Sequence, residues 1–263
     1  MSLSESGQEA AQQEAAQQAQ EQAVQQAIES GQPVQFTNSA GETVTVTVTV
    51  NTPPGSIHGA PGSGAENYAT YSYSIDGGDP VEVVTDVPVA DHNEALASVI
   101  DMHSQQPEHL QGTVTQVNVW NRPSDRDEWA HSTPNGDGTS TLDFFEGTSH
   151  LHDQGLFDHE FGHAVGHYVD TLQETPYEAW REQETGHEQS DMRPHGWEGD
   201  IREDGQGIVH YLGAGSDAVA EDFADSYMEY MQARRDGTLD QYRDTYPNRG
   251  ETLDGILSGS LPA

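Results

Sequence analysis

Two histidines and a glutamate stand at a spacing that can hold and use a metal ion. Residues 159–163 read His-Glu-Phe-Gly-His, and the apolar residues around them recur at the three- and four-residue steps of an amphipathic helix. On a helix, His159 and His163 project from the same face about 6 Å apart, so both imidazoles can bind one zinc ion. Glu160 would lie beside the metal, where it can act as a general base on a water molecule. The pattern therefore predicts a zinc hydrolase.

A catalytic zinc ion needs a third protein ligand, and a second predicted helix offers one. Residues 217–231 form an amphipathic pattern in which Glu221 and Asp225 are four residues apart. Glu221 can bind the metal, while Asp225 can accept a hydrogen bond from the free N–H of a ligating histidine and so fix its tautomer. We therefore expect zinc to be held by His159, His163 and Glu221, with Asp225 behind a ligating histidine.

Two alternatives compete with this site. His167 stands eight residues after His159, roughly 12 Å along a continuous helix, and can join the metal only if the helix ends at Gly166. The chain would then be a metzincin-like protease that uses His167 or Asp170. The other alternative is a non-catalytic binding module with a vestigial zinc site, although an intact Glu160 favours catalysis.

The elements that must position these residues form a mixed α and β pattern. Residues 43–50 alternate threonine with valine, which predicts a strand with all four valines buried. A hairpin is expected over residues 71–84, a helix from Asp91 to a break near Pro107, and further strands over 113–120 and 140–145. The last strand directly precedes the metal helix, where it could line a cleft and pair with an extended peptide.

The chain of 263 residues divides by composition into three parts. Residues 1–32 are rich in alanine and glutamine and predict a helical tail or linker that buries little and is dispensable for catalysis. Residues 33–88 are a β-rich N-terminal region, and residues 89–263 hold the predicted metallopeptidase domain. Residues 173–209 are polar and longer than an ordinary connection, which favours either a functional loop over the cleft or a surface insertion.

The net charge of −36 restricts the partners. All nine basic residues are arginine, against 45 acidic residues, so nucleic acid and anionic membrane surfaces would be repelled while a basic peptide would be attracted. The same acidic surface can also serve solubility alone. No cysteine is present, which excludes disulfides and thiolate zinc sites. With no apolar run long enough for a membrane span and no signal-peptide pattern, we expect a soluble protein.

The two metal-site segments resemble those of a known family. His-Glu-Phe-Gly-His-Ala-Val, followed some 60 residues later by Ala-Glu-Asp-Phe-Ala-Asp, is similar to the gluzincin metallopeptidases, and among them to the anthrax lethal factor-like domain. Residues 242–249 and 253–257 resemble that family's closing helix, so the likeness covers about residues 90–260. It implies a zincin-like α+β fold with two lobes around a zinc cleft, and the activity of a zinc endopeptidase.

The resemblance also sets expectations for localisation and partners. Secreted bacterial toxin-type proteases are among the relatives, which implies a secreted or extracellular protein. Its partners would be a protein or peptide substrate and an inhibitor or immunity protein.

One position departs from the family pattern. The family has an oxyanion-stabilising tyrosine seven residues before the glutamate ligand, where this chain has Ala214. The nearest tyrosine is Tyr211, and we expect Tyr211 or its neighbour His210 to donate to the oxyanion instead. His150 and His152, just before the metal helix, could hold a second metal ion or contact the substrate.

Overall fold

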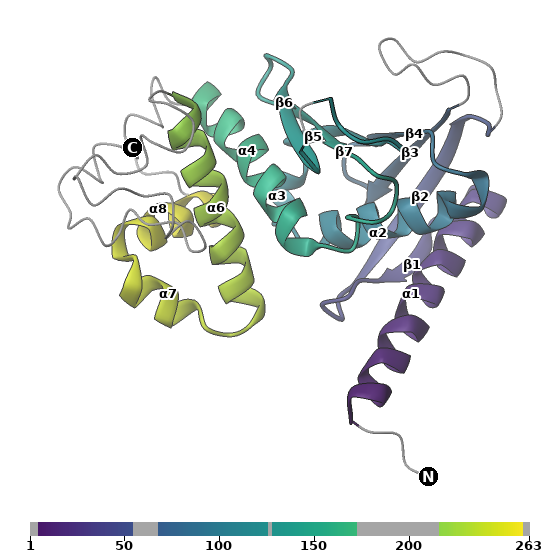
Figure 1. The fold of residues 1–263 in the computed structure, drawn as a ribbon, viewed down its shortest axis with the longest axis horizontal. Coiled ribbons are helices and arrows are strands. Elements are labelled where there is room, and N and C mark those ends of the chain that lie inside the picture. The colour runs from purple at the N-terminus through teal and green to yellow at the C-terminus, as the bar shows by residue number, and fades with distance from the viewer. Residues whose placement is uncertain (1–4, 55–67, 126–127, 173–215, 260–263) are drawn as a thin grey trace. The chain divides into compact units, whose positions relative to one another are not determined.

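Runs of strands and runs of helices follow one another along the chain, which confirms the α+β class (Figure 1). The computed structural model describes residues 5–54, 68–125, 128–172 and 216–259. The chain divides into two compact units. The first unit holds residues 1–131 and 141–153, and the second unit holds residues 132–140 and 154–263.

The strands of the described residues form one mixed sheet in the order β1-β2-β3-β4-β5-β7-β6. Pairing is antiparallel from β1 to β4 and parallel between β4 and β5. The strands are β1 (Val34–Thr37), β2 (Thr43–Thr52), β3 (Ala69–Ile75), β4 (Val81–Thr85), β5 (Val114–Val119), β6 (Ala130–Pro134) and β7 (Ser140–Phe144).

Strand β2 confirms the alternating pattern in part. Val46 and Val48 are buried and Val44 is half-buried, but Val50 is 37% exposed, so the expectation of four buried valines is wrong at the end of the strand. The pairing between β2 and β3 shifts register between Val50 and Thr52. Such an irregularity turns the strand end away from the regular inward alternation.

The expected boundary after residue 88 does not separate compact units. Strand β4 pairs in parallel with β5, with Val83 opposite Val117 and Thr85 opposite Val119. A parallel pair needs a crossover connection, and the helix α2 (His92–Ser104) lies in that connection. The β-rich region and the helix that follows it therefore belong to one structure. Two shorter segments accompany α2, namely η1 (Val89–Asp91) and α3 (Glu108–Gln111).

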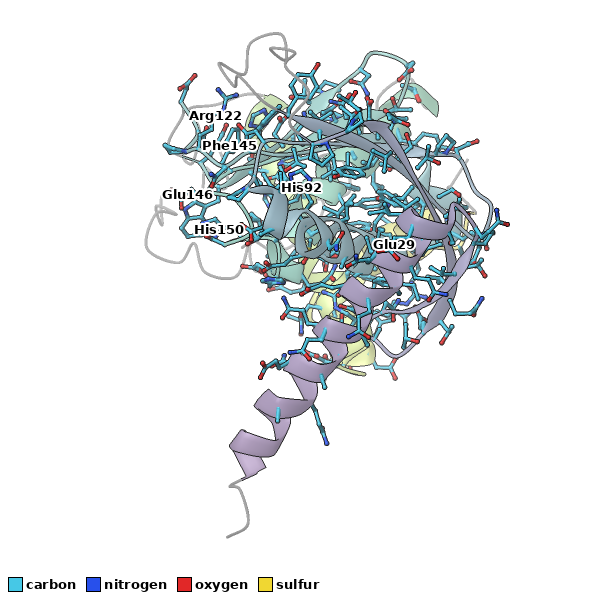
Figure 2. The ribbon with its side chains drawn as sticks, turned by 90° about the vertical axis from the view of Figure 1, so that its right-hand side faces the viewer. Glu29, His92, Arg122, Phe145, Glu146 and His150 are labelled. Atoms are coloured by element: carbon cyan, nitrogen blue, oxygen red, sulfur yellow. The ribbon has the colours of Figure 1, made fainter. Side chains whose placement is uncertain are left out.

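The predicted N-terminal helix is present as α1 (Glu5–Ser30), but half of it is part of the core. Val24 and Ala27 are fully buried, because this half of α1 packs against β1, β2 and α2. Gln20 is also buried, and its amide donates to the carbonyl of Thr37 and to Asp101. The N-terminal half of α1 extends away from the rest of the first unit (Figure 2). The expectation of a tail that buries little therefore holds only for that half.

The strand just before the metal helix is not at the edge of the sheet. Strand β7 lies between β5 and β6, and β6 is the edge strand. An interior strand has neighbours on both sides, so the expected pairing of β7 with an extended peptide is wrong. Strand β6 is not among the strands expected from the sequence, because Ala-His-Ser-Thr-Pro has no apolar alternation.

The described part of the second unit is mainly helical. Its helices are α4 (Gln154–Leu172), α6 (Ser216–Arg235), α7 (Leu239–Thr245) and α8 (Pro247–Leu257). Helices α4 and α6 pack against each other, with Phe161 on α4 beside Tyr227 on α6, both fully buried. No helix among the described residues has the length and apolar character required to cross a membrane.

Candidate metal centre

The two histidines of the metal motif lie on one continuous helix. Helix α4 runs from Gln154 to Leu172, and the rings of His159 and His163 are 4.8 Å apart between centroids and nearly perpendicular. The helix forms here because apolar residues at three- and four-residue steps can be buried against α6. The predicted side-by-side arrangement of the two imidazoles is thus confirmed.

Glu221 joins them from α6. Its Oε2 lies 3.2 Å from Nε2 of His159, and its Oε1 lies 3.4 Å from Nε2 of His163. Among the described residues, these three form the group whose donor atoms, all within 4.8 Å of one another, could share a metal ion. Ligands bound tetrahedrally at about 2.0–2.1 Å are roughly 3.3 Å apart, so both measured separations fit one small ion.

Asp225 lies one helical turn after Glu221 and contacts the other ring nitrogen of His159. Its Oδ1 is 2.8 Å from Nδ1 of His159, and the carboxylate is 7% exposed. A hydrogen bond from Nδ1–H to this carboxylate leaves Nε2 as the ring nitrogen that faces Glu221. Asp225 therefore orients the ring and raises its basicity, as predicted from the four-residue spacing.

The protonation of the three groups follows from these contacts. Burial lowers the pKa of His159, but the hydrogen bonds to Asp225 and Glu221 and the charge of Glu160 outweigh burial and raise that pKa to about 10. Burial raises the pKa of Glu221, but the hydrogen bonds from His159 and His163 outweigh it and lower that pKa to about 2. The carboxylate is thus an ionised donor, and a metal ion that binds here would take the place of a proton.

Glu160 follows the first ligand on α4. Its side chain is 5% exposed, and its charge acts on His159. Glu160 is not one of the three residues whose donor atoms converge, so it stays available for a role other than metal binding.

The structure favours Glu221 over His167 as the third residue of the candidate metal site. Helix α4 continues through Gly166 to Leu172, so the condition under which His167 could reach the other histidines does not hold. Nδ1 of His167 lies 3.1 Å from the hydroxyl of Ser140. Burial, with the charge of His163 as a second cause, lowers the pKa of His167 to about 4. The side chain of Asp170 lies outside the described residues.

No family model, no curated protein and no solved structure matches this chain. The centre therefore rests on its own geometry and on the resemblance of its motifs.

The other residues singled out from the sequence do not join the centre or cannot be placed. Tyr211, His210 and the segment 173–209 lie outside the described residues. His150 and His152 do not converge on a common site in the first unit. Nε2 of His150 is 3.2 Å from Glu146, and Nε2 of His152 is 3.0 Å from Glu94.

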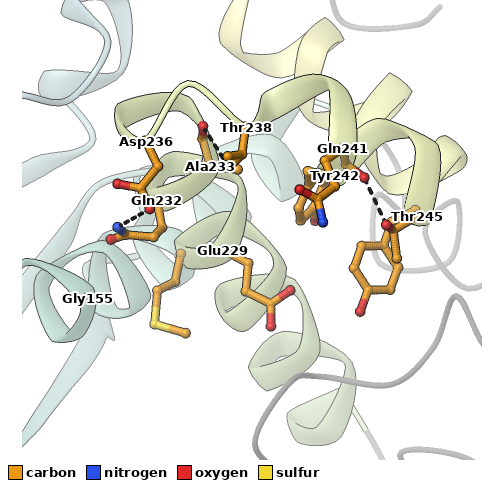
Figure 3. Close-up of a pocket in the computed structure, with 11 residues that line it drawn as sticks. Gly155, Glu229, Gln232, Ala233, Asp236, Thr238, Gln241, Tyr242 and Thr245 are labelled. Carbon is orange, nitrogen blue, oxygen red and sulfur yellow. Dashed lines mark hydrogen bonds between the residues drawn. The ribbon is translucent and has the colours of Figure 1, made fainter.

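A pocket of about 380 Å³ that the sequence analysis did not anticipate lies along α6 and α7 (Figure 3). Its walls include Met228, Tyr242 and Tyr246, and it carries the carboxylates of Glu229 and Asp236. Glu229 is eight residues after Glu221, about 80° around α6 and roughly 12 Å along it, and Asp236 follows the end of the helix. The four-residue repeat that continues from Asp225 to Glu229 was the signal that could have pointed to it.

Proposed function

We propose that this chain is a zinc-dependent endopeptidase of the gluzincin type, with a zincin-like fold. The observation that carries the proposal is the convergence of His159, His163 and Glu221 from two helices at separations that fit one tetrahedral ion. The contact of Asp225 with His159 supports it, because an oriented histidine is typical of zinc centres. Three protein ligands leave a fourth position for water, as in catalytic rather than structural sites.

The chemistry is divided between the ion and the side chains. Zinc bound here would supply Lewis acidity, which lowers the pKa of a water molecule and polarises the scissile carbonyl. Glu160 accepts the proton of the attacking water and delivers it to the leaving amine. Tyr211 or His210 donates a hydrogen bond to the oxyanion, a contribution of a few kcal/mol, in place of the tyrosine that the family has seven residues before its glutamate ligand.

The resemblance extends the proposal to the biology of the protein. A secreted, toxin-type protease acts on a protein or peptide substrate and is held in check by an inhibitor or immunity protein. The charge of −36 supports a peptide rather than a nucleic acid as the substrate.

The experiment separates metal binding from catalysis. The zinc-loaded protein is incubated with a mixed peptide library, and the products are identified by mass spectrometry. We expect cleavage that stops on chelation and returns with zinc. Glu160→Gln should bind zinc with unchanged affinity and lose activity by on the order of 10²–10⁴-fold. Glu251→Gln, an exposed glutamate on α8, is the matched control and should keep full activity.

Three outcomes would overturn the proposal. Full turnover by Glu160→Gln would show that this residue is not the base. Zinc binding that survives Glu221→Gln but is lost in His167→Gln would favour the metzincin-like alternative. Zinc binding by the unaltered chain with no cleavage of any peptide would leave the binding module as the better description.

A further inference from the structure

Helices α4 and α6 are in close contact at a glycine inside the metal motif. A Cβ atom added at Gly162 would lie 2.9 Å from Cα of Ala224, 3.1 Å from its carbonyl oxygen and 3.1 Å from Cβ of Tyr227. Ala224 is fully buried. Two of these three neighbours are backbone atoms, which cannot rotate out of the way as the end of a side chain can. Only the absence of a side chain at Gly162 allows this separation of the two helices.

The metal ligands lie directly beside this contact. His163 follows Gly162 on α4, while Glu221 and Asp225 stand three residues before and one residue after Ala224 on α6. The distance between α4 and α6 at this point therefore sets two separations. One joins Nε2 of His163 to Glu221, and the other joins Nδ1 of His159 to Asp225. Metal–ligand distances tolerate changes of only about 0.2 Å.

We propose that Gly162 is a positioning residue that sets the distance between α4 and α6 and thereby the metal affinity. A methyl group at this position would require its neighbours to retreat to an ordinary contact distance of roughly 3.5 Å or more. Such a movement of about half an ångström or more exceeds the change in metal–ligand distance that is tolerated without strain. The proposal rests on the metal site of the proposed function, but not on peptide cleavage.

Helix propensity alone would make Gly162→Ala stabilising, which is the opposite of the loss expected from the contact with α6. Glycine in the middle of a helix is less favourable than alanine, because it loses more backbone freedom on folding. If Gly162 had no role beyond the helix itself, Gly162→Ala would stabilise the protein and leave zinc binding unchanged. Zinc affinity therefore distinguishes a positioning role from a purely structural one.

The test compares zinc dissociation constants of the full chain, measured by competition with a chromophoric chelator. We expect Gly162→Ala to bind zinc about tenfold to a hundredfold more weakly than the unaltered protein, with helical content maintained. The Co²⁺ absorption spectrum should change as well, because it reports the coordination geometry. Gly250→Ala is the matched control, since its Cβ would lie 3.0 Å from Cγ of Arg243, a similarly tight contact, but on α8, which carries none of the three ligands. It should leave zinc affinity and the Co²⁺ spectrum unchanged.

If Gly162→Ala is not helical without metal, the comparison is made from the rise in Tm that saturating zinc gives each variant, because this rise reports affinity for the folded state. An equal zinc affinity and an identical Co²⁺ spectrum in Gly162→Ala would overturn the proposal. Failure of the unaltered protein to bind zinc would overturn it together with the proposed function. Tight zinc binding without peptide cleavage would defeat the endopeptidase alone, and the affinity of Gly162→Ala would still decide the role of the glycine.

Discussion

The hydroxyl of Tyr73 lies 2.6 Å from Nδ1 of His103 in the core of the first unit. The other ring nitrogen of His103 is 3.1 Å from the carbonyl oxygen of Gln111, so both nitrogens of this buried ring have partners. A matching pair stands two residues earlier on β3, where the hydroxyl of Tyr71 lies 2.6 Å from Nδ1 of His92. Both pairs join β3 to α2. His103 is 1% exposed, so its ring belongs to the core.

The first prediction concerns the stability of the first unit at acidic pH. Burial lowers the pKa of His103 from 6.5 to about 4, against a smaller opposing effect of the Gln111 carbonyl. Between these two values the unfolded chain binds a proton that the folded chain does not. Stability is therefore lost as the pH falls from about 6.5 to about 4, by on the order of 3 kcal/mol, and not further below that.

Urea unfolding at a series of pH values measures this effect. His103→Gln, which cannot titrate, should show a flatter dependence on pH over that range, whatever its stability at pH 7. His109→Gln, at an exposed histidine on α3, should keep the dependence of the unaltered protein. Equal slopes for His103→Gln and the unaltered protein would contradict the assignment.

The second prediction concerns Asp225. Asp225→Asn keeps the shape of the side chain but removes the charge that orients and polarises His159 across 2.8 Å. We expect zinc to bind roughly 10- to 100-fold more weakly. Asp236→Asn removes a charge from an exposed position just after α6 and should leave the zinc dissociation constant unchanged. Equal weakening by both variants would mean that the overall charge, not the contact, sets the affinity.

The third prediction concerns a buried ion pair between α4 and α6. Asp158 has no exposed surface, and its two carboxylate oxygens accept hydrogen bonds from Arg235 and from Gln154. Arg235→Gln leaves that charge buried without its cation and should destabilise the second unit by about 3–5 kcal/mol. Thermal unfolding measures the loss, with Arg234→Gln, the exposed neighbouring arginine, as the control.

A double variant checks the cause of that loss. Asp158→Asn combined with Arg235→Gln removes both charges, so it should regain a large part of the stability. Similar melting temperatures for Arg234→Gln and Arg235→Gln would show that the pair contributes little.

The fourth prediction divides α1 at Gln20. Residues 11–18 are exposed apart from the half-buried Gln17, so deletion of residues 1–18 should change the melting temperature little. Deletion of residues 1–31 also removes the fully buried Val24 and Ala27 and both hydrogen bonds of Gln20, and should cost several kcal/mol. Calorimetry of the two truncated proteins decides, and equal melting temperatures would restore the interpretation of the whole helix as a tail.

The fifth prediction concerns substrate charge. The negative net charge, together with Glu229 and Asp236 in the pocket along α6, favours peptides with arginine or lysine near the cleaved bond over acidic ones. The preference should weaken as salt rises from about 0.05 to about 0.5 M, because the Debye length falls from roughly 14 to roughly 4 Å. Rates of cleavage for peptides with arginine, its neutral analogue citrulline or glutamate at the same position measure it.

Paired variants test whether the pocket contributes to that preference. Glu229→Gln with Asp236→Asn should reduce it about fivefold. Asp244→Asn with Glu251→Gln removes the same charge from exposed positions outside the pocket and should not. Equal cleavage of all three peptides at low salt would mean that the acids serve solubility alone.

The candidate centre was accessible from the sequence because its geometry is local. His159 with His163, and Glu221 with Asp225, are each four residues apart on one helix, and helical periodicity alone places each pair on one face. Pairing the two helices needed only the chemical requirement for a third ligand. The role of Gly162 could not be read in the same way, since a close approach depends on what packs opposite it.

The errors arose where contacts far apart in the sequence decide the structure. The parallel pairing of β4 with β5 joins segments on both sides of the expected domain boundary. Val24 and Ala27 in the C-terminal half of α1 are buried because α1 packs against β1, β2 and α2, although the residues of the helix are mostly small or polar. Strand β6 forms because it pairs with β7, since its own sequence has no alternation of apolar and polar residues.

The origin of the ligands on two helices has a consequence for the unfolded chain. A metal ion held by His163 and Glu221 closes a loop around the 57 residues between them. In the chain-entropy treatment of cross-links, closing a loop of that length lowers the entropy of the unfolded state by the equivalent of about 4 kcal/mol. A protein without a single cysteine would thus carry in its metal ion the kind of cross-link that a disulfide bond supplies elsewhere.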